Sequence, residues 1–596
     1  MRKFILVIVV LFVLGFSQDM GLTGRVVSFG DVSALDLGSK STKLFYPFVD
    51  FVIEDVSYSG NPFNVTVNVT FTHTPSQEEI NSLAFYDGDW NEDTGSSSVD
   101  NWVIRFTGVR LGEWTFFTES DTPDLDGLTG TIHVDPQDNP LVHGGKRNHG
   151  NWWTIIDYQG NEKPFVPVIY HHEENSLKMY VTSFSDIFST RESQIEYLLS
   201  IMKDNHANVA VLGVMAAWTD KDSNAYGLYW SANPEDNPQN PDIRSFVIIE
   251  DIAKRLAEAG MELHLWKWRD EDGSDFATPA HIGGINQEQD RRLQRYIAAR
   301  LGPVLNWHMS YGIDMHEEWA TPQQVLDWYD YMNEHMGWFH HLAVRERLED
   351  QRSGIFVMGE DKLDYHSDDH KAGLEEDMYS LTAEFVSASP ELPFVYERRF
   401  LHTRDGIWDM DTTRRGMWQF WMAGGGTAVW GRMWGDNTPH YPNPEQIGIF
   451  RSFWENYTRT DFERNNAFTD GYGLSSLDSG IQRLVAYKED TISVQLDLSS
   501  ATSINAAVAV DTKGSSYEEI DISASLSPGA INMWEAPISS DWPLFTKIIL
   551  GIFANLPWEG PISSDWALYI EARFEESVHE TMVLKSERVK GFNKSP

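Results

Sequence analysis

The sequence predicts a multidomain protein in which a (β/α)8 TIM barrel is flanked by an N-terminal Ig-like β-sandwich and a small C-terminal β-sandwich. The barrel is predicted because short apolar runs alternate with helical segments from residue 164 to about residue 460, and eight such runs can be counted. The sandwiches are predicted because apolar and polar residues alternate with a period of two before and after this region.

Residues 46–135 predict the N-terminal sandwich. Four runs in this region alternate apolar with polar residues and are separated by Gly, Asn and Asp, which favour turns. These runs are 51–56, 63–71, 102–106 and 114–118. Residues 136–163 are rich in Gly, Asn and His, and we expect them to form a linker.

Residues 164–460 contain the eight predicted barrel strands. They are 164–170, 207–214, 261–266, 309–315, 341–346, 362–367, 392–397 and 426–431. Helical segments fall between the first strands at 192–205, 246–259, 289–301 and 322–335, and a further one at 444–457 closes the barrel. The sixth strand, 362–367, is the least apolar of the eight.

Residues 468–575 predict the C-terminal β-sandwich, with strand patterning at 484–487, 491–498 and 506–510. Within this region the stretch 534–545 recurs as 558–569, an offset of 24 residues. A single duplication is too little for a solenoid, which needs at least about three repeats. Residues 576–596 predict a polar tail.

The first 17 residues predict a signal peptide. Arg2 and Lys3 precede an apolar run over 4–16, and small residues follow it, with an expected cleavage after Ser17. We therefore expect a secreted or periplasmic protein. No other run approaches the roughly 20 apolar residues of a membrane span, so no membrane insertion is expected.

Composition excludes several classes of partner. The chain has 89 acidic and 46 basic residues, and a formal charge of −43 disfavours nucleic acid and anionic membranes. It has no cysteine, which rules out disulfides and thiolate metal sites. His316-Glu317 lacks the second histidine of a zinc-protease helix because residue 320 is alanine. We expect neither a metal nor a cofactor.

Acids and aromatic residues follow the predicted strands, where a parallel barrel carries its active site. Those that we expect to bind substrate are His171, His172, Glu174, Trp266, Trp268, Arg269, Asp314, His316, Trp319, His366, Trp430 and Arg432. Glu317 and Glu318 follow strand four, and Glu397 follows strand seven. Cleavage of an acetal needs one protonated carboxyl and one ionised carboxylate, and indole rings stack on sugars. This inventory therefore predicts a glycosidase.

Several short motifs also resemble a known family. The Phe85-Tyr86-Asp87-Gly88 and Gly112-Glu113-Trp114 stretches are similar to the N-terminal domain, of unknown function, of secreted apiosidase-like and cellulase-like glycoside hydrolases. Residues 313–319, Ile-Asp-Met-His-Glu-Glu-Trp, resemble the Trp-Asn-Leu-Gly-Glu-Glu-Asn signature that this family carries on strand four. Pro393-Phe394-Val395 before Glu397 continues the match.

The resemblance implies a clan A barrel that hydrolyses a polysaccharide or oligosaccharide with retention of configuration. It implies Glu318 as acid/base and Glu397 as nucleophile, with Glu317 as the fallback acid/base. Asp314, His316 and Trp319 stand where the family has Asn, Gly and Asn, which leaves the substrate class open. The alternative is a non-catalytic glycan-binding or cell-surface protein on the same barrel.

Overall fold

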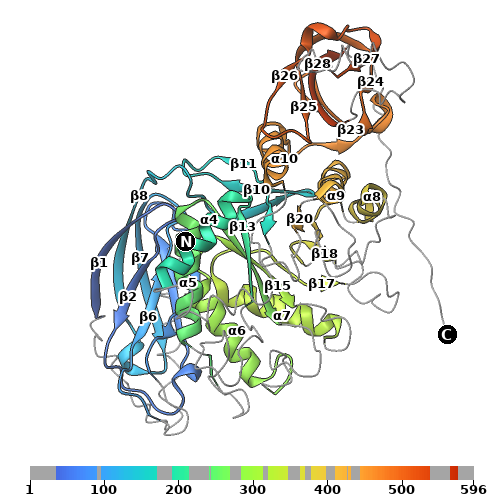
Figure 1. Ribbon diagram of the computed structural model, residues 1–596. Coiled ribbons are helices and arrows are strands. Elements are labelled where there is room, and N and C mark those ends of the chain that lie inside the picture. The colour runs from blue at the N-terminus through green and yellow to red at the C-terminus, as the bar shows by residue number, and fades with distance from the viewer. Residues whose placement is uncertain are drawn as a thin grey trace, which may run out of the picture.

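A computed structural model gives a β-rich, multidomain protein (Figure 1). It describes residues 35–89, 96–170, 191–213, 240–241, 243–268, 283–312, 320–346, 363–368, 378–388, 390–396, 410–425, 427–430, 443–536 and 564–574. The blue N-terminal strands lie beside the green helices of the middle region, and the orange and red C-terminal strands lie at the other end of the molecule (Figure 1).

The N-terminal region is built from two sheets. The larger has the order β1-β8-β7-β3-β4, with β1 parallel to β8 and the other pairs antiparallel. Its strands are β1 (Asp36–Lys43), β3 (Val67–His73), β4 (Glu79–Leu83), β7 (Gly112–Ser120) and β8 (Thr129–Asp135). The smaller is β2 (Val49–Ile53), β6 (Trp102–Phe106) and β5 (Phe85–Tyr86). Short 3-10 turns form at Pro62–Asn64 and Pro123–Leu125.

Alternation along the strands explains this packing. In β3 and β7 every second residue is buried, and Phe116 of β7 meets both Phe71 of β3 and Phe51 of β2, which belongs to the other sheet. All four strands predicted here overlap observed strands. β6 departs from simple alternation because all five of its residues are buried. Its outer side chains, among them Arg105, contact the helices described below.

Residues 146–163, which the sequence assigned to a linker, form a three-stranded antiparallel sheet together with Pro164. The strands are β9 (Lys146–His149), β10 (Trp152–Ile156) and β11 (Glu162–Pro164), in the order β11-β10-β9. Trp152, Trp153 and Ile155 are buried, and burial of these large apolar side chains holds the segment against the protein. Its Gly, Asn and His content indicated turns and obscured this apolar core.

The central region is a sheet of parallel strands. Their order is β16-β15-β14-β13-β12-β20-β19-β18-β17. The strands are β12 (Ile169–Tyr170), β13 (Val209–Gly213), β14 (Glu262–Trp268), β15 (Trp307–Gly312), β16 (Leu342–Ala343), β17 (Arg345–Glu346), β18 (His366–Asp368), β19 (Phe394–Tyr396) and β20 (Thr427–Trp430). β16 and β17 stand at the two ends of this order, yet only Val344 separates them in the chain. They therefore occupy one strand position, and the parallel pairings close into a ring. Each of the eight predicted strand positions contains a strand.

Apolar side chains meet inside this closed sheet. Ile169, Val209, Ala343 and Val395 belong to strands that are not all neighbours, yet they form one buried cluster with Trp153 of β10. They can contact one another only across the inside of the sheet. The side chains of alternate residues on each strand therefore point inward.

Five of the described helices overlap the predicted segments, whereas 378–388 and 410–422 form helices that the sequence analysis did not place. The described helices are α4 (Arg191–Asp204), α5 (Ile243–Glu258), α6 (Glu288–Leu301), α7 (Pro322–Met336), α8 (Met378–Ala388), α9 (Met410–Met422) and α10 (Pro444–Tyr457). Local chemistry explains their limits. In α7, Thr321 and Gln324 form a capping box, Pro322 occupies the first turn, and Gly337 ends the helix with a φ of 73°. No described helix is long and apolar enough to cross a membrane.

A buried ion network joins the N-terminal sheets to two of these helices. Arg105 of β6 donates to Glu250 of α5 over 2.5 Å and pairs with both oxygens of Asp50. Arg300 of α6 donates from Nε to Glu250 Oε1, also over 2.5 Å, and from Nη1 to Asp87 over 2.7 Å. One carboxylate thus serves two buried guanidinium groups at this interface.

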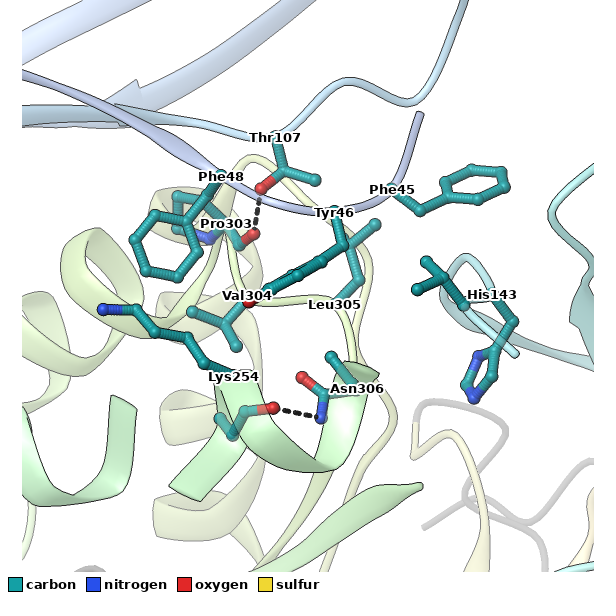
Figure 2. A pocket seen from close by; sticks show the side chains of 13 residues that line it. Phe45, Tyr46, Phe48, Thr107, His143, Lys254, Pro303, Val304, Leu305 and Asn306 are labelled. Atoms are coloured by element: carbon teal, nitrogen blue, oxygen red, sulfur yellow. Dashed lines mark hydrogen bonds between the residues drawn. The ribbon is translucent and has the colours of Figure 1, made fainter. Parts of the chain in front are cut away.

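Close packing surrounds the network. Thr107 donates to the carbonyl oxygen of Pro303, and Asn306 Nδ2 donates to the carbonyl oxygen of Ala253 over 2.9 Å (Figure 2). A cavity of about 10 Å³ remains between Phe48 of the sandwich and Lys254 of α5 (Figure 2). This volume accommodates about one water molecule. The interface is therefore a packed contact and leaves no room there for a sugar.

The C-terminal region carries the predicted second set of strands. A six-stranded sheet has the order β21-β22-β23-β28-β25-β26, and β24 pairs with β27. The strands are β21 (Glu463–Arg464), β22 (Tyr472–Asp478), β23 (Ile481–Thr491), β24 (Ser493–Leu498), β25 (Ala501–Asp511), β26 (Ile520–Asp521), β27 (Ala530–Glu535) and β28 (Ser564–Phe574), with 3-10 turns at Asn466–Phe468 and Ser523–Ser525.

The duplicated stretch contributes to two of these strands. Trp534 of the first copy lies on β27 and Trp566 of the second copy on β28, with ring centroids 5.0 Å apart. Asp565 of the second copy is buried and accepts from Arg414 of α9 over 2.5 Å. The second copy thus links the C-terminal sheet to the central region.

Asp364 is a buried carboxyl that couples α7 to β16. It accepts from the backbone N–H of Leu342 over 2.9 Å and from the hydroxyl of Tyr329 over 3.0 Å. Burial raises the pKa of Asp364 to about 7, although the two hydrogen bonds oppose the rise. The folded protein therefore holds this proton nearly to neutral pH, whereas the unfolded chain releases it near pH 4.

We expect Asp364→Asn to remove this pH dependence. The free energy that Asp364 contributes to folding is fully present below about pH 4 and is lost as the pH rises to about 7, because the ionised form is then buried. Asparagine stays neutral, so the variant should gain up to about 4 kcal/mol relative to wild type between these limits, at about 1.4 kcal/mol per pH unit. Urea unfolding at several pH values measures the difference. Asp327→Asn, at an exposed site on α7, is the control. A constant difference between Asp364→Asn and wild type would contradict the expectation.

Candidate active site

The carboxyl ends of the parallel strands meet at one rim of the sheet. β14 ends at Trp268 next to the end of β15, where Gly312 is its register partner. β19 ends at Tyr396, which pairs with Ala428 of β20. Since all these strands run in the same direction, residues that follow them start from the same rim.

Three predicted acids follow this rim. Glu317 and Glu318 come five and six residues after the last residue of β15, and Glu397 directly follows β19. All three lie outside the described residues. So do the predicted substrate-binding residues His171, His172, Glu174, Arg269, Asp314, His316, Trp319 and Arg432. The described strands thus define where these segments begin.

Two predicted substrate-binding tryptophans lie on the described rim. Trp266 shares a face of β14 with His264, and their ring centroids are 5.8 Å apart. Trp266 is 5% exposed and Trp268 is 1% exposed. Their register partners on β15, Ser310 and Gly312, are small. The small partners accommodate the indole rings across neighbouring strands.

A buried ion pair supports this pair of tryptophans. Lys267, between them on β14, donates to Asp290 in the first turn of α6, and both side chains are fully buried. Asp290 also accepts from the N–H of Asn286 over 2.8 Å and from Gln294 over 2.9 Å. Burial lowers the pKa of Lys267 to about 8, and the charge of Asp290 opposes this shift.

Sequence reasoning missed the Lys267–Asp290 pair. The available signal was a lysine between two tryptophans in a predicted buried strand, since a lysine in such a position needs a partner. Asp290 is 23 residues away in the sequence and could not be identified without the fold. The ion pair holds the carboxyl end of β14 against α6.

His366 and Trp430 are the other two predicted substrate-binding residues that lie within the described part of the chain. Tyr365 packs on Trp153 of β10 with ring centroids 5.6 Å apart, so its side chain points into the closed sheet. His366, the first residue of β18, pairs in register with Phe394 of β19, and the Phe394 ring packs on Phe385 of α8, so His366 lies on the outer face. For Trp430 the structure establishes the backbone pairing with Tyr170 of β12. Among the described residues no group of three or more His, Asp or Glu could hold a metal ion.

Comparison with solved structures defines the class of fold, which is glycoside hydrolase-like. The chain is similar to a candidate glycoside hydrolase from Bacteroides vulgatus ATCC 8482 at 13% identity and a TM-score of 0.60, covering 90% of this chain and 100% of that chain. It is also similar to a structure named as a glycoside hydrolase, at 11% identity and a TM-score of 0.50, covering 72% and 97% of the two chains.

At the level of families, one model matches part of the sequence. It is described as a domain of unknown function (DUF5060) and matches residues 45–121, which lie in the N-terminal sheets. No curated protein matches the chain. The low identities to solved structures establish a shared fold, and the chemistry has to be argued from the site.

Proposed function

We propose that the chain is a secreted retaining glycoside hydrolase with its active site at the carboxyl rim of a (β/α)8 barrel. One observation carries the proposal: the closed order of parallel pairings puts the ends of β15 and β19 at one rim, and Glu318 and Glu397 follow those ends. The glycoside hydrolase-like fold supports it. In this proposal residues 1–17 direct export, residues 164–460 form the barrel, and residues 46–135 and 468–575 form the flanking sandwiches.

The two acids have different roles in the proposed reaction. Glu318 donates a proton to the leaving glycosidic oxygen, and Glu397 attacks the anomeric carbon to form a glycosyl-enzyme intermediate. Glu318 then takes a proton from the water that hydrolyses this intermediate. Val395 points into the closed sheet, so continued alternation along β19 would direct Glu397 inward as well. A retaining reaction requires carboxyl groups about 5 to 5.5 Å apart.

The proposed substrate is a carbohydrate polymer or oligosaccharide. Trp266 and Trp268 are buried at the end of β14, where they form the floor of the rim, and the segments that follow the strands contain Trp319, His171 and His172. Indole faces stack on the C–H surfaces of sugars, and imidazoles hydrogen-bond to hydroxyls. This combination suits a neutral sugar backbone.

A panel of plant and marine polysaccharides tests the proposal directly. We expect at least one polymer to release reducing sugars, and we expect proton NMR of the first product to show the anomer of the substrate linkage. Inversion of that anomer would contradict the assignment of Glu397 as nucleophile. Saturable binding of a glycan without any product would favour the alternative, a glycan-binding protein.

A further inference from the structure

The sheet formed by β9, β10 and β11 covers the amino-terminal end of the parallel sheet. We call residues 146–164 the plug. Trp153 of the plug contacts His308, His341 and Tyr365 with ring centroids 5.1, 5.6 and 5.6 Å away. His308 is the second residue of β15, and His341 and Tyr365 directly precede β16 and β18. The plug therefore lies opposite the rim that carries the predicted acids.

Polar groups hold the plug in this apolar setting. Lys146 of β9 forms an ion pair with Glu262, the first residue of β14, and its Nζ lies 2.6 Å from His308 Nδ1. His308 Nε2 in turn lies 2.7 Å from Nδ1 of His264. All four side chains are buried. We call Lys146, Glu262, His308 and His264 the latch.

Only one assignment of donors and acceptors fits the hydrogen bonds of the latch. The Lys146 ammonium, paired with Glu262, has only donors, so His308 Nδ1 must be the acceptor. The proton of His308 then sits on Nε2 and is donated to His264 Nδ1. Both rings are neutral in this arrangement, and the charge of Lys146 is balanced by Glu262. The latch is thus electrically neutral as a whole.

One additional proton disrupts this arrangement. A proton on Nδ1 of His308 would face the Lys146 ammonium, and it would add a second buried positive charge beside the one that Glu262 already balances. Among the described residues, the other titratable groups that face His308 do not supply a further negative charge. His143 lies 3.9 Å from Glu262, His341 is bonded to Asn148 of the plug, and His340 and Tyr365 are uncharged. Glu262 is already matched by Lys146.

We propose that the latch is an acid-sensitive switch in which uptake of one proton by His308 releases the plug while the C-terminal sheet stays folded. Burial and the charge of Lys146 both lower the pKa of His308, so the latch is closed at neutral pH. Asp364, next to Tyr365, keeps its proton in acid and does not drive release. The switch is independent of the proposed hydrolase activity.

Hydrogen exchange of the full-length protein tests the proposal. Amide exchange is followed at pH 7.5 and across pH 4 to 6, with rates corrected for the intrinsic effect of pH. We expect residues 146–164 to lose protection by more than tenfold in acid, while β23 keeps its protection. Unchanged protection of the plug would overturn the proposal, and so would loss of both regions at the same pH.

Variants of the latch identify the group that titrates. Lys146→Met leaves Glu262 beside His308, whose Nδ1 is 3.8 Å from Glu262 Oε2, so a protonated His308 gains a counter-ion. We expect the midpoint of plug release in this variant to lie at about tenfold higher proton concentration, or about one pH unit lower, than in wild type. His308→Gln, which cannot be protonated, should shift release in the same direction. A midpoint equal to that of wild type in both variants would overturn the proposal.

His340→Gln is the matched control. His340 is also buried, and burial lowers its pKa to about 4, but it bonds to the carbonyl of Gly302 and stacks on Trp307. We expect this variant to release the plug at the wild-type pH. If His340→Gln shifted release as far as Lys146→Met does, the latch would not be the switch.

Discussion

Glu397→Ala should abolish hydrolysis of an activated aryl glycoside. The loss should exceed the roughly 10² to 10⁴-fold that a positioned general acid contributes, because the covalent intermediate can no longer form. Azide is small enough to enter the space left by the carboxylate and can attack the anomeric carbon from that side. We therefore expect azide to restore part of the rate and to yield a glycosyl azide of inverted configuration. Release of the aryl group measures the rate, and NMR identifies the product.

The matched control for this variant is Glu391→Ala. Glu391 is exposed and lies just before β19, at the opposite end of the strand from Glu397. Its removal should leave the rate unchanged. Wild-type activity in Glu397→Ala would remove this residue from the site. Loss of activity without rescue by azide, in a folded variant, would contradict a nucleophilic role and leave Glu397 as a binding residue.

The largest effect on stability is expected from Glu250→Ala. Glu250 accepts from Arg105 and from Arg300 over 2.5 Å each, and all three side chains are buried. Removal of one partner from a buried ion network leaves uncompensated charge, which costs about 3 to 5 kcal/mol. The variant should unfold at correspondingly lower urea concentration, as measured by tryptophan fluorescence.

The penalty should depend on pH in a defined direction. Burial raises the pKa of Glu250, but the charges of Arg300 and Arg105 more than offset this, and the net pKa lies below the ordinary value. The contribution of Glu250 is therefore present above about pH 4.5 and is lost as the pH falls through its lower folded pKa. Glu258→Ala removes an exposed acid of the same helix, and it should cost less than about 1 kcal/mol. Equal effects of the two variants would show that the network contributes no special stability.

The period of the apolar residues was sufficient to predict most elements. The segments 322–335 and 444–457 became α7 and α10 within one residue at each end, because Pro322 and Pro444 start both helices and local capping ends the first. The eight parallel strands were also found where short apolar runs occur. Local signals fail in residues 146–164, where turn-forming residues interrupt three strands that are held by burial of Trp152 and Trp153.

The sequence could predict only part of the candidate site, because only local signals can be recognised in it. Proximity to a strand end can be recognised in the sequence, and it led to Trp266, Trp268 and the acids Glu318 and Glu397. The face of a strand that a polar residue occupies depends on register, which the sequence does not show: His366 points outward whereas Tyr365 points inward. Lys267 and Asp290 were overlooked because the need for a partner is visible in the sequence and the partner is not.

Two kinds of information can thus be separated in this chain. Backbone periodicity, caps and strand ends are local properties, so the amino-acid sequence alone determines the fold class and the positions of the candidate acids. Pairing among buried charges is a property of distant residues: Arg105 and Glu250 are 145 positions apart, and Lys146 and His308 are 162 apart. Only the tertiary structure brings such groups together, because a buried charge is tolerated where the fold supplies its partner.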